Sequence, residues 1–98
     1  MNFNQKCYNL LKYVPKGKVT TYKALANKLN SKAYRAVGNA MNKNPDSPNT
    51  PCHRVINSDG NLGGFAFGIK EKIKLLKSEG IEIKNNKIDL KKYEYQFL

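Results

Sequence analysis

The sequence Pro-Cys-His-Arg-Val at residues 51–55 constrains this chain more than any other feature. It places the only histidine, His53, directly after Cys52, which is one of two cysteines. The thiolate is the reactive form of cysteine, and a neighbouring imidazole is the usual means of forming it at neutral pH. A buried, inert cysteine beside a surface histidine is the alternative interpretation, since free cysteines are most often buried. The flanking residues have to decide between the two.

Those flanking residues form a recognisable pattern. Ile56 follows the pentapeptide, glycines follow at 60, 63 and 64, and Leu-Leu-Lys-Ser-Glu-Gly occupies residues 75–80. The combination resembles the active-site signature of the O6-alkylguanine-DNA alkyltransferases, in which Pro-Cys-His-Arg-Val-(Val or Ile) precedes a glycine-rich turn and Leu-Leu-x-x-Glu-Gly. The resemblance runs from about Phe3 to Gly80. It implies the family's minimal C-terminal catalytic domain, without the usual N-terminal domain.

The resemblance implies a single-turnover methylated-DNA–protein-cysteine methyltransferase. Such a protein repairs DNA by moving the alkyl group of O6-alkylguanine irreversibly to its own cysteine, without a metal or cofactor. Cys52 corresponds to the nucleophile, and His53 to the base that acts through a water and is oriented by Glu79. Tyr22 corresponds to the tyrosine that crowds the target phosphate and donates toward the departing guanine. Asn44 corresponds to the asparagine that ties the recognition helix to the active-site loop.

The same resemblance implies double-stranded DNA as the partner, with the alkylated guanine flipped out through the minor groove. Arg35 corresponds to the arginine that fills the vacated space in the duplex. The other residues expected at the DNA, besides Tyr22, are Lys32, Ala33, Ala36 and Gly38. Close approach to a narrow groove is one reason for such small residues, and tight packing between helices is the other.

Four residues are expected to surround the guanine: Val55, Phe65, Ala66 and Phe67. Ala66 stands where the family often has serine, a harmless change if only its backbone amide contacts the base. Phe67 is expected to narrow the pocket against large alkyl groups, or alternatively to cover the core.

The charge distribution points to a polyanionic partner independently of the resemblance. Residues 1–45 contain nine basic and no acidic residues, whereas residues 46–98 contain nine basic and seven acidic ones, which gives +9 and +2 and recovers the total of +11. An N-terminal half whose charges are all positive predicts a polyanionic partner, with nucleic acid as the first candidate and an anionic membrane surface as the second. A merely soluble, lysine-rich surface is the alternative.

Several other classes are disfavoured. No apolar run approaches the length of a membrane span, and the first residues lack a signal pattern, so we expect a cytoplasmic, DNA-associated monomer. Two cysteines and one histidine cannot supply a structural zinc site. The glycine-rich loop at 62–68 lacks the Lys-Ser/Thr ending of a phosphate-binding loop, which disfavours nucleotide hydrolysis.

Cys7 is expected on the buried face of the first helix, and a disulfide between Cys7 and Cys52 would be unusual in a reducing compartment.

The expected fold is a mainly α domain with short β elements (α+β), a winged helix-turn-helix-like single domain over residues 1–98. Helices are expected over residues 3–14, 22–29, 32–44 and 69–79, with Thr21 and Ser31 as caps of the second and third. Extended segments are expected at 19–21 and 55–56, an irregular loop at 46–50 and a turn at 57–61. Residues 81–84 and 87–90 are expected to form a hairpin, and the aromatic tail at 93–98 to pack back on the domain.

Three other interpretations of the function compete with transfer. The alkyltransferase-like proteins bind lesions without chemistry and usually replace the nucleophile with tryptophan, whereas this chain has Cys52 and no tryptophan. A helix-turn-helix regulator would explain the charge but would leave Cys52, His53 and Glu79 without a role. A peripheral membrane protein would need a bulky, exposed apolar helix face, which the helices lack.

Overall fold

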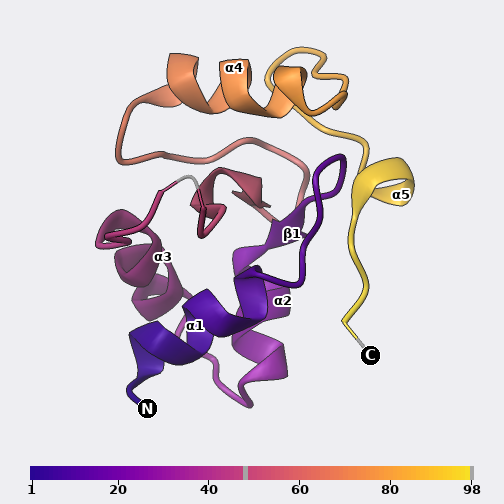
Figure 1. Ribbon diagram of the computed structural model, residues 1–98. Coiled ribbons are helices and arrows are strands. Elements are labelled where there is room, and N and C mark those ends of the chain that lie inside the picture. Colours follow the sequence, from indigo (N-terminus) through magenta and orange to yellow (C-terminus); the bar gives the residue numbers. More distant parts are fainter. Residues whose placement is uncertain (48, 98) are drawn as a thin grey trace.

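The computed structural model describes residues 1–47 and 49–97, so Pro48 in the 46–50 loop and Leu98 in the tail lie outside the described residues. The elements in chain order are α1 (Phe3–Leu11), β1 (Thr20–Thr21), α2 (Tyr22–Lys28), α3 (Tyr34–Asn42), the 3-10 turn η1 (Cys52–Arg54), β2 (Val55–Ile56), α4 (Ile69–Ser78) and α5 (Leu90–Tyr93) (Figure 1). The described chain is mainly helical with one small sheet, which confirms the expected fold class.

The helix starts follow local capping, with one exception. Asn2 and Gln5 form a reciprocal capping box at the start of α1. Thr21 caps α2 as expected, because its hydroxyl accepts a hydrogen bond from the Ala24 amide at 3.0 Å. The prediction for α3 was wrong at its start: the Ser31 hydroxyl accepts from the Ala33 amide, and the helix begins only at Tyr34.

The two-stranded sheet is parallel and separates two apolar clusters. Thr20 pairs with Val55 and Thr21 with Ile56. Because successive side chains of a strand point to opposite faces, Val55 joins the cluster under α1, α2 and α3, while Ile56 joins the cluster under α4. Figure 1 shows this division, with α4 on one side of the strands and α1–α3 on the other. The pentapeptide leads directly into β2, so the reactive pair lies between the two clusters.

The first cluster also contains Cys7, which is fully buried on the inner face of α1. Burial raises the pKa of its thiol, so Cys7 remains a protonated, apolar core residue. The expected structural role of this residue therefore agrees with its environment.

The C-terminal segment differs from the expected hairpin. Asn85 and Asn86 both have positive φ values, as a tight two-residue turn requires, but only one bridge, Lys84 to Lys87, closes it. The second arm pairs with the 57–61 turn instead, and Leu90 begins α5, so α4 is not the last helix. Beyond α5 the tail runs beside β1, where the Tyr95 amide donates to the Val19 carbonyl at 2.7 Å.

No helix in residues 1–47 and 49–97 combines the length and apolar character that crossing a membrane would require.

Candidate functional site

The reactive pair lies in η1, a single tight turn between the loop that follows α3 and strand β2. All three residues of this turn are buried, and Cys52 is 3% exposed. The loop before it is held by Asn44, whose side-chain amide donates to the Thr50 carbonyl at 2.7 Å. Asn44 follows the end of α3, so this hydrogen bond ties α3 to the segment that carries the thiol. The Cys52 thiol donates a weak hydrogen bond to Ser47, with 3.7 Å between Cys52 Sγ and Ser47 Oγ.

His53 is fixed by Glu79, the residue at the C-terminal end of α4. His53 Nε2 and Glu79 Oε2 are 2.9 Å apart, and burial lowers the pKa of the imidazole more than the carboxylate raises it. The imidazole is therefore neutral at pH 7. Because a carboxylate only accepts hydrogen bonds, Nε2 carries the proton and Nδ1 presents a lone pair. Nδ1 is buried and has no hydrogen-bond partner among the described residues, so it is available to take a proton.

Arg54 completes this cluster and was not among the predicted site residues. Its Nε and Nη2 donate to the two oxygens of Glu79 at 2.9 and 2.7 Å, and its Nη1 donates to the Val14 carbonyl at 2.8 Å. Burial alone would raise the pKa of Glu79, but the hydrogen bonds from Arg54 and His53 outweigh it and hold that pKa below its usual value. A signal was present in the sequence: Arg54 is one of only two arginines among eighteen basic residues, and arginine suits a two-point contact with a carboxylate.

Lys72 is the second functional residue that the sequence reasoning missed. It is fully buried on the inner face of α4, and its ammonium group donates to three carbonyls: those of Val55 at 2.7 Å, Leu62 at 2.6 Å and Gly64 at 3.0 Å. Burial lowers its pKa to about 8, against an opposing effect of Cys52. Lys72 thus joins β2 to the glycine-rich loop. Its position four residues before buried Leu76 is the sequence signal for a lysine on an apolar face.

A groove of about 550 Å³ lies between the start of α2, α3 and the turn after β2. It brings together three of the residues predicted for DNA, Tyr22, Arg35 and Gly38. The groove is also lined by Lys23, Tyr34, Asn57, Ser58 and Asp59. Tyr22 reaches from the first turn of α2 toward the site, and burial together with nearby Cys52 raises the pKa of its hydroxyl.

The small residues of α3 have different environments. A Cβ built on Gly38 would meet no atom within 4 Å, so tight packing between helices does not explain this glycine. Arg35 is exposed and Ala36 is half-buried on the same helix. Lys32 and Ala33 are exposed and precede the helix, and neither lines the groove.

The predicted pocket residues separate into two groups. Val55 is buried in the sheet, and Phe65 is half-buried against the first cluster. Ala66 is exposed, and Phe67 is 63% exposed, which excludes the alternative that Phe67 covers the core. Its ring meets that of Phe65 edge-on, with 5.5 Å between the centroids. Phe67 also lines a hollow of about 330 Å³ with Ser47, Glu71 and Leu75. Ser47 therefore contacts both this hollow and the thiol of Cys52.

Comparisons with known proteins agree with this arrangement. A family profile described as "6-O-methylguanine DNA methyltransferase, DNA binding domain" matches residues 2–81. A curated relative, the "Bifunctional methyltransferase/endonuclease" of Picrophilus torridus, is 52% identical over 90% of this chain and 30% of the relative. A "Methylated-DNA--protein-cysteine methyltransferase" of Sulfolobus acidocaldarius is 46% identical over 84% of this chain and 52% of the relative. The chain thus spans about half the length of these curated relatives or less.

Among solved structures, Schizosaccharomyces pombe Atl1 in complex with damaged DNA containing O6-carboxymethylguanine superposes with a TM-score of 0.85 and 31% identity, covering 96% of this chain and 94% of that one.

Proposed function

Because this chain belongs to the 6-O-methylguanine DNA methyltransferase family, we propose that it is the catalytic part of such a protein and transfers the alkyl group of O6-alkylguanine in DNA to its own Cys52. The observation that carries the proposal is the buried Cys52–His53 turn, in which Glu79 holds a neutral imidazole whose Nδ1 has no hydrogen-bond partner in residues 1–47 and 49–97. This is the general arrangement of an activated nucleophile, its base and a group that orients the base.

The reaction breaks the S–H bond of Cys52 and the bond between the alkyl carbon and O6. It forms one C–S bond and leaves a guanine that regains one proton. Cys52 gives its proton to Nδ1 of His53, through a water in the geometry that the family resemblance implies. The thiolate attacks the alkyl carbon, and the electron pair of the breaking C–O6 bond stays on the guanine. The Tyr22 hydroxyl keeps its proton at neutral pH, because its pKa is raised, and donates a hydrogen bond to the departing guanine anion. The anion then takes a proton from solvent, and His53 releases to solvent the proton that it took from the thiol. The thioether is stable, so each molecule reacts once. In this proposal none of the steps uses a metal or cofactor.

DNA enters along the groove between α2 and α3. A base stacked in a duplex is out of reach of a buried thiol, so the target guanine has to be flipped out. Arg35, exposed on α3, fills the space in the duplex, and Tyr22 crowds the phosphate of the flipped nucleotide. Gly38 keeps α3 thin where it enters the minor groove, which agrees with the open space beside its Cα. We propose that residues 1–98 perform these steps as one domain and as a monomer.

Lesion binding without transfer is the second candidate function. It is favoured by one observation, the TM-score of 0.85 with S. pombe Atl1 bound to damaged DNA, over nearly the whole of both chains. The contacts among His53, Glu79 and Arg54 favour transfer, since binding alone gives no reason to hold an imidazole with its lone pair free inside the core.

Mass spectrometry separates the two candidates. After incubation with duplex DNA containing O6-methylguanine, the peptide that contains Cys52 should gain one CH₂ group, and the Cys52→Ser variant should gain none. Cys7→Ser is the matched control and should be modified like the original protein. Tight binding of the modified duplex with Cys52 unchanged after prolonged incubation would support lesion binding and contradict transfer.

A further inference from the structure

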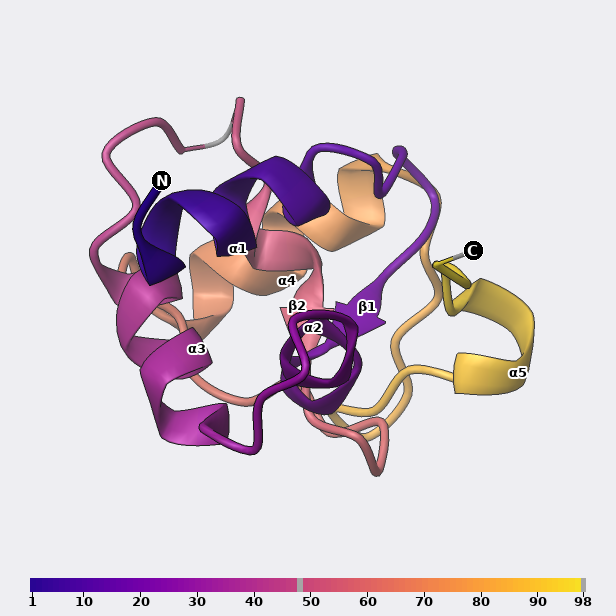
Figure 2. The same ribbon diagram turned by 90° about the horizontal axis from the view of Figure 1, so that it is seen from below.

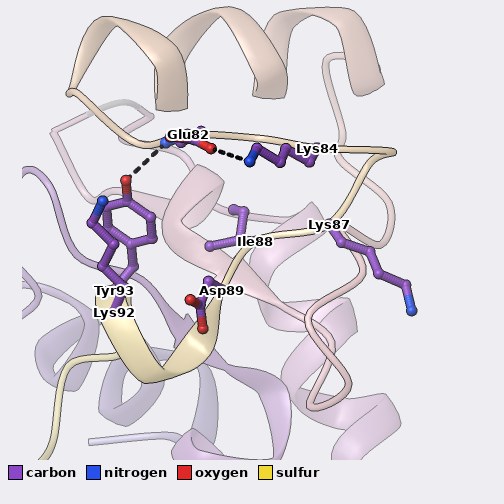
Figure 3. Close-up of a pocket in the computed structure, with 7 residues that line it drawn as sticks. All are labelled: Glu82, Lys84, Lys87, Ile88, Asp89, Lys92 and Tyr93. Carbon is purple, nitrogen blue, oxygen red and sulfur yellow. Dashed lines mark hydrogen bonds and ion pairs between the residues drawn. The ribbon is translucent and has the colours of Figure 1, made fainter.

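The segment that follows the family match carries a basic turn of its own. Residues 84–87 form it, with Asn85 and Asn86 at its tip and an exposed lysine at each end. Lys84 forms an ion pair with Glu82 at 3.1 Å, whereas Lys87 forms none with any residue that the structure describes. Figure 3 shows the Lys87 side chain extending away from the other side chains around this turn. Lys87 is therefore the lysine of this turn that is open to an external anion.

This turn is fastened to the turn after β2. The Ile88 amide donates to the Gly60 carbonyl at 2.9 Å, and the Leu62 amide donates to the Asn86 carbonyl at 3.2 Å. A Cβ on Gly60 would lie 2.7 Å from the Ile88 carbonyl oxygen, so the contact requires glycine at that position. Figure 2 shows the two turns side by side. They form one surface.

That surface continues the groove proposed for DNA. The 57–61 turn contributes Asp59 to the groove, and Asp59 is the one acid among its described lining residues. A carboxylate at this place repels DNA phosphates. The antiparallel bridge between Asn61 and Lys87 places Lys87 beside the 57–61 turn that carries Asp59. Hydrogen bonds from Asn61 lower the pKa of Asp59, and the positive charge of Lys87 lowers it further.

We propose that the 84–87 turn extends the DNA-binding face beyond the groove, with Lys87 offsetting Asp59 and contacting a backbone phosphate next to those bound along α2 and α3. The inference rests on the proposed function for its ligand, double-stranded DNA. A phosphate contact is independent of base sequence, so Lys87 contributes to affinity and to the length of duplex covered.

The test measures binding of unalkylated duplex DNA against salt concentration for Lys87→Gln and for the control Lys74→Gln. Lys74 is exposed on α4 and does not line the groove. Each variant loses one lysine, so the two have equal net charge. Loss of one phosphate contact lowers the slope of log K against log salt by about 0.9, so Lys87→Gln should show this drop and Lys74→Gln should not. Equal slopes for the two variants would overturn the proposal.

A second pair of variants tests whether Lys87 reaches a phosphate or only offsets the acid. In an Asp59→Asn background, Lys87→Gln should still lower the slope by about 0.9. An effect that disappears in this background would mean that Lys87 acts on Asp59 alone, which contradicts the phosphate contact. Alkyl transfer from free O6-methylguanine, followed by mass, should be unchanged in Lys87→Gln. Salt-dependent binding through Lys87 in a protein that never alkylates Cys52 would refute the proposed function and leave this inference standing.

Discussion

Glu79→Gln should be among the most damaging single changes in this chain, because three hydrogen bonds between charged or polar groups converge on one buried carboxylate. The Glu79 side chain is 8% exposed, and it accepts two hydrogen bonds from Arg54 and one from His53. Glutamine has nearly the same shape but no charge, so the Arg54 guanidinium would lose its counter-ion inside the protein. Breaking a buried ion pair in this way costs about 3–5 kcal/mol. A small domain has about 5–15 kcal/mol of stability in total.

The assay is denaturant unfolding of the variant beside a matched control, Glu82→Gln. Glu82 also pairs with a basic residue, Lys84, but both side chains are exposed, so this change should leave the unfolding midpoint where it was. A second measurement follows the imidazole of His53 by NMR. Glu79 favours its protonated form, so the pKa of His53 should fall further in Glu79→Gln. Equal unfolding midpoints for the two variants, or an unchanged His53 titration, would refute the reasoning.

The remaining predictions concern pH, the glycine-rich loop, base flipping and the alkyl pocket. Burial lowers the pKa of His53, the only histidine, in the folded protein. The contribution of His53 to stability should therefore be complete above its pKa in the unfolded chain, about 6.5, and the free energy of unfolding should fall below that pH by at most about 1.4 kcal/mol per pH unit. A His53→Gln variant that keeps this slope in unfolding experiments would contradict the assignment of the slope to His53. Lys72→Met leaves three buried carbonyls without their donor and should lower the free energy of unfolding by about 1–3 kcal/mol, which chemical denaturation would detect. Arg35→Lys keeps the charge but loses the planar guanidinium group, so repair of duplex DNA should slow more than reaction with free O6-methylguanine. Equal losses of rate on the two substrates would instead mean that Arg35 acts in the alkyl transfer itself or in folding. Phe67→Gly should selectively raise the rate of benzyl transfer from O6-benzylguanine. Brisk benzyl transfer by the unmutated protein would show that the exposed ring does not restrict the hollow that it lines with Ser47.

Local patterns in the sequence predicted most of the helices and the short strands. Thr21 caps α2, Asn30 breaks the chain after it with a positive φ, and residues 55–56 form the expected strand. These features depend on hydrogen bonds and steric limits within four residues or so, which a sequence displays directly. The candidate reactive residues were also visible, because Cys52 and His53 are adjacent and a negative charge at a helix C-terminus, as at Glu79, calls for a compensating partner.

Only the tertiary structure decided what surrounds those residues. Arg54 binds Glu79 across 25 positions, Lys72 reaches Val55 across 17, and the tail at Tyr95 pairs with Val19 beside β1. The second arm of the expected hairpin pairs with the 57–61 turn, which brings Lys87 toward Asp59. Such pairings depend on which distant groups meet when the two apolar clusters close on the sheet. A buried charge is tolerated only where that closure supplies its partners, and sequence spacing carries no record of them.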